Sequence, residues 1–499
     1  MILELLVSLL AVFGFGLALS WSRIVPVARD ALKVTMQGLS SMTDSELDDD
    51  AKEVAVRRAG FQLIFASFNI SWRFAVALAA AAVPIYLGDG LGFVSSHAVF
   101  GLMLRWDYII VVSIVAMGLT EVLRRRRPAG DEETTHVNRY SAADRMIHVM
   151  AFSSPVVLKT ASALEDRLCS KPTQQPSGPP IFITSLARGG TTALLNALHD
   201  VTGIATHTYR DMPFLTAPIL WNRVSGGHKR SVDRHERAHG DGLEIDLDTP
   251  EAFEEIIWKM FWPEHYRKAS IPLWRPEHRK AHAERFLERH MAKIIHARTS
   301  KDKDGEADST RYCSKNNANV ARIPYLREAF PDCDIIVPVR RPECHAASLL
   351  RQHRNFLKLH AEDEFIERYM RDIGHFEFGN LHKPFQFPGF STDIYHPTTG
   401  NYWLNYWIHA FRKILADSDR CIFVLQDDLR SSPQATMTGL CGALNVDGDS
   451  LAFHGYFRSS ADRSPTDAYE QRLYEEAATL YRQLEERALR SARQAASVS

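Results

Sequence analysis

The sequence has few cysteines, almost no net charge and no metal-binding motif. None of its six cysteines lies in a Cys-x-x-Cys pair, and no histidine pair has zinc-ligand spacing. This excludes a disulfide scaffold and a zinc finger, and it predicts free, buried thiols in a reducing compartment. With 59 basic and 60 acidic residues the net charge is −1, which argues against a nucleic-acid partner. The 499 residues suffice for two or three globular domains.

Long apolar stretches occur only in the first 127 residues. They cover 5–21, 59–88 and 108–123, and the second and third are interrupted by Arg73 and Glu121. A transmembrane helix needs about 20 apolar residues. We therefore expect a membrane domain over 1–127 with about three transmembrane helices. Two spans, or a hairpin that dips into the bilayer, are the alternatives.

Basic residues predict the orientation of these spans. Several lie between the first two apolar stretches, only Arg105 lies between the second and third, and Arg124 to Arg127 follow the third directly. Because positive charge marks the cytoplasmic side, the N-terminus is expected outside and the rest of the chain in the cytoplasm. The pattern indicates a multi-pass membrane protein whose catalytic domain is cytoplasmic.

The remaining chain divides into three parts. Residues 128–178 are expected to form a helical connector that ends in a turn-rich linker. The main domain is expected over 179–460, and a charged C-terminal helix over 461–499.

A phosphate-binding loop is predicted at the start of the main domain. The β-branched run 181–185 indicates a buried strand, and the apolar positions of 193–198 indicate a helix. Between them lie Arg188, Gly189, Gly190, Thr191 and Thr192. Glycines let the main chain approach an anion, and a helix N-terminus presents free N–H groups to it. The loop is not a Walker A motif, because the lysine before its threonines is missing.

A second anion-binding element is predicted further along the chain. Residues 334–339 indicate a strand, which is followed by Arg340 and, eight residues later, by Ser348. An arginine together with a hydroxyl suits a sugar phosphate. The fold expected from both elements is α/β, a P-loop-like three-layer domain with a central parallel sheet.

Together these residues resemble the sulfotransferases that use 3′-phosphoadenylyl sulfate (PAPS). That family pairs a Gly-Thr-Thr loop after a basic residue with a later strand, an arginine and a serine eight positions on. The segments 312–316 and 324–331 are similar to tyrosylprotein sulfotransferases, where the residue matching Lys315 faces the transferred group. The segments 400–403 and 424–429 are similar to elements of other members. The loop departs from many members by having Arg188 in place of lysine.

The resemblance implies PAPS as co-substrate and no metal. The loop 188–192 would hold the 5′-phosphosulfate, Arg340 and Ser348 the 3′-phosphate, and Lys315 the sulfuryl group, with Arg188 as a fixed charge near the reaction. The general base would be Asp211 or His207, with Asp241 and Glu244 as further acidic candidates. The acceptor would be a hydroxyl or amine compound, such as a glycan or a lipid, and the location a bacterial inner membrane.

Two other functions fit parts of the sequence. The hydrophobic segment 421–425 followed by Asp427 and Asp428 is typical of a magnesium-binding strand end, as in a nucleotide-dependent kinase. The missing loop lysine counts against this. The second alternative is a non-catalytic membrane protein that binds an anionic ligand.

Overall fold

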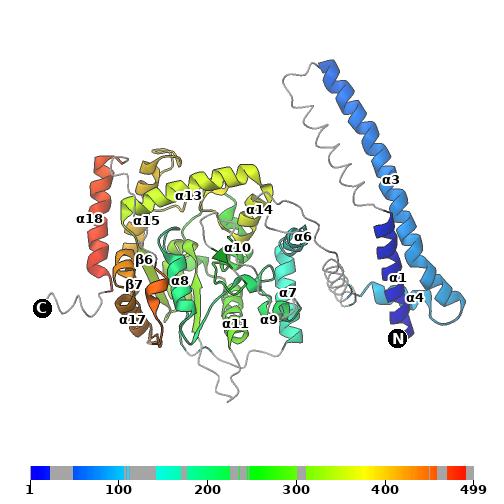
Figure 1. Ribbon diagram of the computed structural model, residues 1–499, viewed down its shortest axis with the longest axis horizontal. Helices are drawn as coiled ribbons and strands as arrows, with labels where there is room; N and C mark the ends of the chain where they lie inside the picture. The colour runs from blue at the N-terminus through cyan, green and yellow to red at the C-terminus, as the bar shows by residue number, and fades with distance from the viewer. Residues whose placement is uncertain are drawn as a thin grey trace, which may run out of the picture. The chain divides into compact units, whose positions relative to one another are not determined.

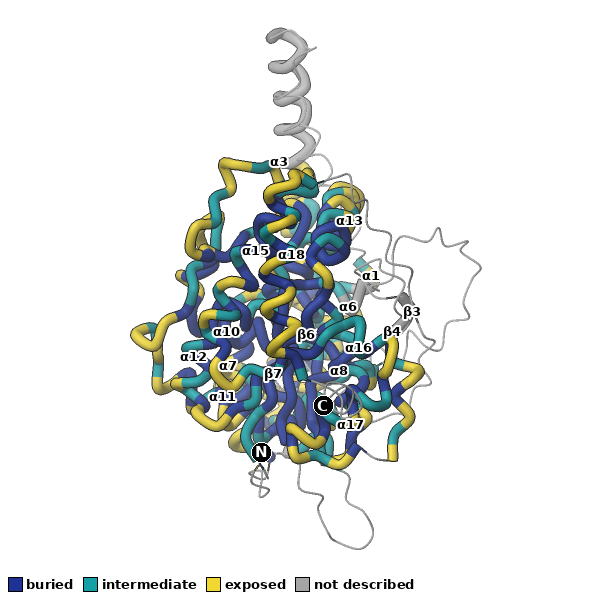
Figure 2. The backbone as a smooth tube through the Cα atoms, turned by 90° about the vertical axis from the view of Figure 1, so that its left-hand side faces the viewer, coloured by how far each residue is buried: buried dark blue, intermediate teal, exposed yellow. Residues whose placement is uncertain are grey.

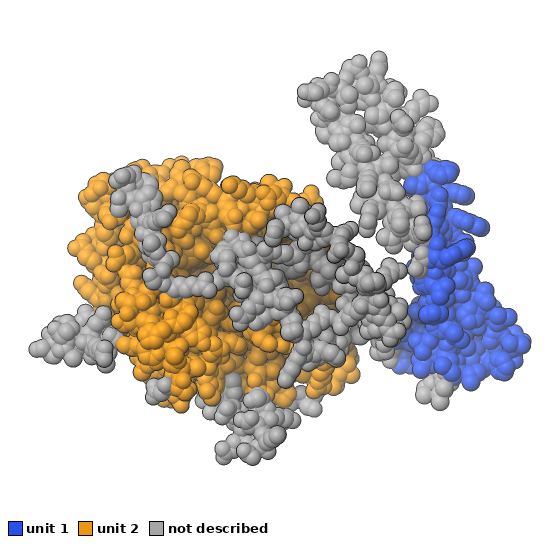
Figure 3. Space-filling model, viewed as in Figure 1, with its two compact units in different colours: residues 1–135 blue, residues 136–499 orange. Residues whose placement is uncertain are grey.

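The structure is a computed structural model of the chain. It describes residues 2–22, 49–105, 142–169, 178–224, 247–299, 311–448, 450–457 and 469–489, with short pieces at 108, 112, 176, 235–236 and 244–245. The chain divides into two compact units, Met1–Thr135 and His136–Ser499 (Figure 3).

The described residues of the first unit lie mainly in helices with long apolar segments. The helices are α1 (Ile2–Trp21), α3 (Asp49–Gly90) and α4 (Ser96–Met103). A Cβ atom added at Gly14 of α1 would lie 3.1 Å from the Ala80 carbonyl oxygen of α3, so the two backbones approach closely there. Small residues allow such close approach between membrane helices.

One described helix is long and apolar enough to cross a membrane. It is the segment Phe65–Gly90 of α3, whereas the apolar part of α1, Leu3–Leu19, is shorter. Large apolar side chains such as Leu10, Phe68 and Trp72 are exposed on these helices. The third predicted span, 108–123, lies outside the described residues apart from positions 108 and 112. The expected set of about three spans is thus found only in part, as one helix of sufficient length.

The second unit is built on a parallel sheet (Figure 1). Its strand order is β2-β5-β1-β6-β7, and every neighbouring pair is parallel. The strands are β1 (Ile181–Ile183), β2 (Ile204–Ala205), β5 (Arg311–Lys315), β6 (Asp334–Val339) and β7 (Cys421–Leu425). A separate antiparallel pair joins β3 (His235–Glu236) to β4 (Glu244–Ile245). Parallel strands bring their carboxyl ends to one edge, where the predicted anion-binding residues follow β1 and β6.

Helices cover both faces of this sheet. Phe182 belongs to one buried cluster and its neighbours Ile181 and Ile183 to the other, because alternate side chains of a strand point to opposite faces. The smaller cluster packs under α8 and α17, and the larger one under helices that include α10, α11 and α15. Figure 2 shows β6 and β7 buried among the surrounding helices. The α/β class and the three layers agree with the prediction.

The helices of the second unit are α6 (Ala142–Ala151), α7 (Pro155–Leu168), α8 (Thr191–His199), α9 (Pro218–Val224), α10 (Glu255–Phe261), α11 (Ala281–Arg298), α12 (Ile323–Ala329), α13 (Pro342–Glu362), α14 (Glu364–Ile373), α15 (Gly400–Ala416), α16 (Gln426–Ser431), α17 (Pro433–Leu444) and α18 (Gln471–Arg487). The predicted C-terminal helix is α18, and Leu473, Ala477 and Leu484 place it in the larger core. All six cysteines are free thiols, and all but the partly exposed Cys421 are buried.

A buried ion pair lies below the carboxyl end of β5. Arg322 is fully buried and donates from Nη1 to Glu255 Oε2 at 2.7 Å. Its guanidinium group lies between two indole rings, 4.5 Å from the centroid of Trp258 and 4.3 Å from that of Trp274. Glu255 also accepts from Asn316 Nδ2 at 2.7 Å, so this pair fixes the residue next to Lys315.

We expect Arg322→Ala to destabilise the fold strongly, because it leaves the Glu255 carboxylate buried without its charged partner. Loss of one member of a buried pair costs about 3–5 kcal/mol. Urea unfolding of the full chain in detergent measures this. The control is Arg412→Ala, which removes an exposed ion pair with Glu476 and should cost at most about 1 kcal/mol. An equal loss of unfolding free energy in the two variants would contradict a stabilising role for the buried Arg322–Glu255 pair.

Candidate active site

The loop between β1 and α8 has the backbone of an anion-binding turn. Arg188 and Gly190 adopt left-handed conformations, with φ of 68° and 98°. A Cβ atom at Gly190 would lie 3.0 Å from Gln426 Nε2, and one at Gly189 would lie 2.7 Å from Ser185 Oγ. Both glycines are therefore required by the close packing of this loop. The first turn of α8, from Thr191, presents its N–H groups at the loop end.

His345 of α13 holds this loop in place. Its Nε2 donates to the Ala187 carbonyl oxygen at 2.8 Å, and the side chain is fully buried. Burial, with the nearby charge of Arg340, lowers the pKa of His345 to about 3. The imidazole is therefore neutral at pH 7 and fixes the loop without adding a charge.

The two predicted anion-binding elements meet. Arg340 follows β6 and donates from Nη1 to the Arg188 carbonyl oxygen at 3.3 Å. Arg188 donates from Nε to Ser348 Oγ of α13 at 3.4 Å. Because β1 and β6 are neighbours in the sheet, residues 152 to 160 positions apart in the chain line one cavity. The structure thus brings Arg188, Arg340 and Ser348, which come from two separate predicted elements, to one cavity.

Lys315 lies at the end of β5, on the other side of β1. Its Nζ donates to Thr192 Oγ1 and to Glu251 Oε1, both at 3.1 Å. Lys315 and Glu251 are both almost completely buried. The ammonium group is therefore held beside the first turn of α8 by a carboxylate that the sequence analysis did not identify.

These residues line a cavity of about 320 Å³, here called the donor cavity. Among the described residues its lining contains five basic side chains, four arginines and one lysine, and one carboxylate, Glu377. The sequence analysis identified Arg188, Lys315 and Arg340 but missed Arg351 and Arg430. Such an excess of positive charge favours a ligand with several negative charges.

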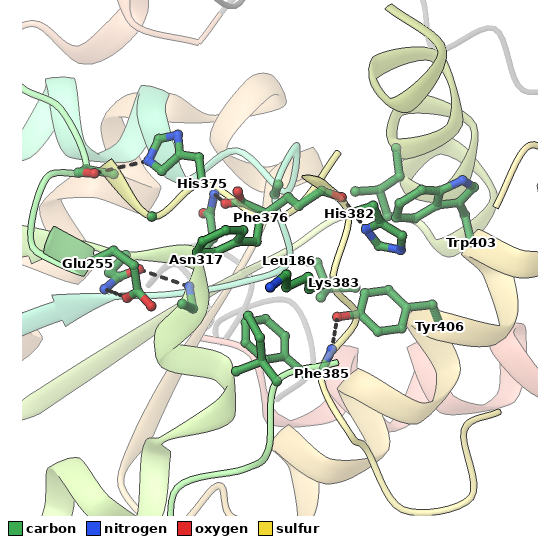
Figure 4. A pocket seen from close by; sticks show the side chains of 18 residues that line it. Leu186, Glu255, Asn317, His375, Phe376, His382, Lys383, Phe385, Trp403 and Tyr406 are labelled. Carbon is green, nitrogen blue, oxygen red and sulfur yellow. Dashed lines mark hydrogen bonds between the residues drawn. The ribbon is translucent and has the colours of Figure 1, made fainter. Parts of the chain in front are cut away.

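A second, narrow cavity adjoins the donor cavity and is here called the aromatic cavity. Ala187, Asn317, His375 and Glu377 line both cavities. Figure 4 shows His375 and Asn317 on one side of the aromatic cavity and His382, Trp403 and Tyr406 on the other. The site therefore has a cationic and an apolar part with a common boundary.

The structure does not bring Asp211 and His207 to either cavity. Neither residue is among those that line the two cavities. Asp211 is fully buried, and its Oδ2 accepts from Arg298 Nη2 at 2.5 Å and from the Thr208 amide at 3.0 Å. The Nε2 of His207 lies 3.1 Å from the hydroxyl of Tyr312. In this structure both side chains belong to a buried hydrogen-bond network.

The remaining acidic candidates cannot be placed in the site. Asp241 lies outside the described residues, and Glu244 is described only by its backbone in β4. Within the described part of the chain, no three metal-ligating side chains come together.

Comparison with known proteins assigns the family. Residues 179–382, which include the loop, Lys315, Arg340 and Ser348, match the model of the Sulfotransferase family. The chain therefore contains a sulfotransferase-family domain, and the protein is a transferase of this class. No curated protein matches the chain.

Three solved sulfotransferase structures are similar to the chain. Sulfotransferase STF9 from Mycobacterium avium is 12% identical with a TM-score of 0.39, and the match covers 73% of this chain and 94% of that one. Sulfotransferase STF1 from Mycobacterium tuberculosis is 13% identical with a TM-score of 0.35, over 67% and 84% of the two chains. The sulfotransferase domain of a Synechococcus olefin synthase is 16% identical with a TM-score of 0.26, over 65% and 93%. The family assignment rests on the family model.

The surroundings of Asp211 predict a structural role. Burial alone would raise the pKa of Asp211, but hydrogen bonds and charges of His207 and Arg298 outweigh it and lower the pKa to about 2. A carboxyl group with a lowered pKa stabilises the fold above its unfolded pKa of about 4, and this contribution is lost as the pH falls towards 2. We expect Asp211→Asn to lower the free energy of unfolding at pH 7, with a difference from wild type that shrinks between pH 4 and pH 2.

Urea unfolding at several pH values measures this difference. Turnover per folded molecule is measured on the same preparations and should stay within a few-fold of wild type. Lost turnover in a protein of unchanged stability would instead identify Asp211 as the base.

Proposed function

We propose that the protein transfers a sulfuryl group from PAPS to a hydroxyl or amine of an acceptor. The observation that carries this proposal is the donor cavity, where Arg188, Lys315, Arg340 and Ser348 meet inside the family-matching segment. PAPS carries a 5′-phosphosulfate and a 3′-phosphate, so it needs cations at two separate points. The two anion-binding elements supply them from different strand ends.

Each part of the donor has a proposed partner. The loop 188–192 holds the 5′-phosphosulfate with its amides, the hydroxyls of Thr191 and Thr192, and the charge of Arg188. Arg340 and Ser348 hold the 3′-phosphate, since a planar guanidinium and a hydroxyl together match a phosphate group. Arg351 and Arg430 add positive charge around the same ligand.

Lys315 stabilises the transferred group. In this proposal the acceptor oxygen attacks sulfur in line with the bond to the 5′-phosphate, and negative charge develops on the bridging oxygen that leaves. A fixed ammonium group next to the loop stabilises that charge without rearranging. Its contacts with Thr192 and Glu251 support this role, because they hold the flexible lysine chain in one position.

The general-base role of Asp211 and His207 stays a prediction, and their absence from the lining of both cavities counts against it. A carboxylate that is bound to Arg298 and has a pKa of about 2 is also a weak proton acceptor.

A kinase has less support from the same site. Asp427 lies in α16, after β7, and its carboxylate accepts a hydrogen bond from Arg341 Nε at 2.6 Å. One of the two acidic side chains that would bind magnesium in a kinase is therefore already paired with an arginine. The loop also lacks the lysine that such enzymes use to contact the phosphates.

We further propose that the protein lies in a bacterial inner membrane, with more than one span and with its catalytic domain on the cytoplasmic side. The apolar segment Phe65–Gly90 and the exposed apolar side chains of α1 and α3 support membrane insertion. The distribution of basic residues supports the orientation. The cytosol would then supply PAPS directly to the site.

Removing either arginine should weaken donor binding. We expect Arg188→Ala and Arg340→Ala each to raise the Kd for PAPS about 10- to 100-fold, since each loses a charge-assisted contact worth about 1.5–3 kcal/mol. Titration calorimetry with PAPS, and transfer of labelled sulfate to mixed lipid and glycan extracts, measure binding and turnover. Arg412→Ala on the surface of α15 is the control and should behave as wild type.

Three results would count against this function. If PAPS binds to both arginine variants as it does to wild type, the donor does not bind in this cavity. Phosphorylation that requires ATP and magnesium would favour the kinase. Tight PAPS binding without turnover on any acceptor would favour the binding protein.

The membrane proposal predicts that the full chain behaves as an integral membrane protein. We expect it to float with phospholipid vesicles in a density gradient and to stay with them in alkaline carbonate, because apolar helix surface is held by the bilayer core. Protease added to inside-out inner-membrane vesicles should digest residues 136–499, whereas right-side-out vesicles should protect them. Release by carbonate, or the opposite protection pattern, would contradict the proposal.

A further inference from the structure

Four large apolar side chains are exposed in the described part of the second unit, and three of them lie on α6 and α7. These three are Met150, Val156 and Leu168, which are between 41% and 66% exposed. The fourth is Ile394, in the loop before α15. Apolar side chains scattered singly over a surface need no explanation. Their concentration on two short helices points instead to an interaction surface.

The inner face of α7 is fixed to the rest of the second unit. Lys293 of α11 is almost completely buried and donates from Nζ to Ser162 Oγ at 3.0 Å. The same ammonium group lies 3.1 Å from Glu165 Oε1 and 2.7 Å from Asp166 Oδ1. Leu158 belongs to the larger buried core. The opposite face of this helix is therefore held in a defined place on the surface of the unit.

That outer face of α7 is basic as well as apolar. Residues three or four positions apart lie on one side of a helix. Four exposed residues of α7 have this spacing: Val156, Lys159, Ala163 and Arg167. The Nζ atom of Lys159 lies 4.6 Å from the centroid of the Phe261 ring. The outer face thus combines two cations with apolar and aromatic groups.

Helix α11 extends this surface on the other side of Phe261. The Phe261 ring lies 5.1 Å from the ring of Phe286 and 5.5 Å from that of His282, and both belong to α11. Arg285 and Arg289 are exposed on the same side of α11 as His282, because the three are spaced by three and four positions. We call this combined surface the basic face; it consists of Val156, Lys159, Ala163, Arg167, His282, Arg285 and Arg289.

The cations of the basic face are not neutralised within the described part of the chain. There, Lys159, Arg167, Arg285 and Arg289 form no ion pair. Nearby acids already have other partners, since Asp166 is paired with Lys293 and Glu264 with Lys280. The exposed Glu288 of α11 offsets one of the four charges. The face therefore carries a net positive charge and favours an anionic partner.

The position of the basic face in the chain favours a membrane as that partner. In the proposed topology the last span ends before Arg124 to Arg127, and α6 begins at Ala142. Residues 128–141 can span at most about 50 Å even when fully extended. The bilayer is thus present at high effective concentration, which no separate protein or nucleic acid would have. Anionic lipids attract basic side chains at the cytoplasmic surface, and apolar side chains such as Val156 can enter the interface.

We propose that the basic face binds anionic lipid headgroups of the membrane that anchors the chain. This inference rests on the proposed membrane location, because the short connector keeps the face near the bilayer. Lys159, Arg285 and Arg289 bind the headgroup phosphates, and Val156 enters the apolar edge of the interface. The contact fixes the orientation of the second unit on the membrane.

The test uses the full chain in lipid nanodiscs, made either of phosphatidylcholine alone or with added phosphatidylglycerol. A fluorophore is attached at Ala163→Cys, the discs contain a lipid with a spin-labelled headgroup, and labelled wild type corrects for the partly exposed Cys421. We expect the spin label to quench the fluorophore about twofold more strongly in the anionic discs. A fluorophore at Thr479→Cys on α18, which lies far from α7 in Figure 1, should be equally bright in both.

Charge reversal tests which residues bind the lipid. The double variant Arg285→Glu with Arg289→Glu should abolish the difference between the two kinds of disc, as should high salt, which screens exposed charges. Its Kd for PAPS should stay within a few-fold of wild type, since neither arginine lines the donor cavity. The matched control, Arg472→Glu with Arg482→Glu, makes the same charge change on exposed positions of α18 and should keep the difference.

The possible failures are distinguishable. If the full chain does not insert into the discs, the membrane location fails and this inference fails with it. If the chain inserts but the quenching at position 163 is the same in both kinds of disc, only the inference is overturned. If the α18 control removes the lipid dependence as completely as the α11 variant, the attraction is a general effect of charge and the basic face is not the lipid-binding surface.

Discussion

The hydrogen bonds that join the loop after β1 to the start of α13 hold the whole donor cavity together. Arg340 binds the Arg188 carbonyl oxygen, Arg188 binds Ser348, and His345 binds the Ala187 carbonyl oxygen. These contacts gather arginines that repel one another around one space. Partly buried positive charge is costly unless a partner neutralises it, and a ligand with negative charge at two points supplies that partner.

Two buried carboxylates also fix the end of β5, the strand next to β1. Glu251 holds Lys315, and Glu255 holds Arg322 and Asn316, so the end of β5 is fixed from both sides. Asn317 follows directly and connects Thr191 to Glu377. Lys315, the first turn of α8 and Glu377 are thus joined through the short segment 315–317. A change in either carboxylate is expected to disturb both cavities.

Local sequence patterns predicted the parts of the site that depend on local geometry. Short-range sequence patterns are enough to predict the strand, glycine loop and helix at 181–198 and the strand before Arg340. The parallel sheet then brings these elements together. Glu377, His375 and Arg430 were missed because they follow α14 and β7 without a regular spacing to any other motif. The only signal was two proton acceptors, His375 and Glu377, close behind Gly374. Asp211 was chosen for its position after the loop helix, but its carboxylate caps the turn beginning at Tyr209 and points to Arg298.

The most direct measurement is an experimental structure of the full chain with adenosine 3′,5′-bisphosphate. The account predicts the 5′-phosphate at the amides of the loop 188–192 and the 3′-phosphate within hydrogen-bond distance of Arg340 and Ser348, with Lys315 beside the 5′ end. A nucleotide bound elsewhere, or bound with its 3′-phosphate away from Arg340, would contradict the central claim that one doubly anionic donor fills this cavity.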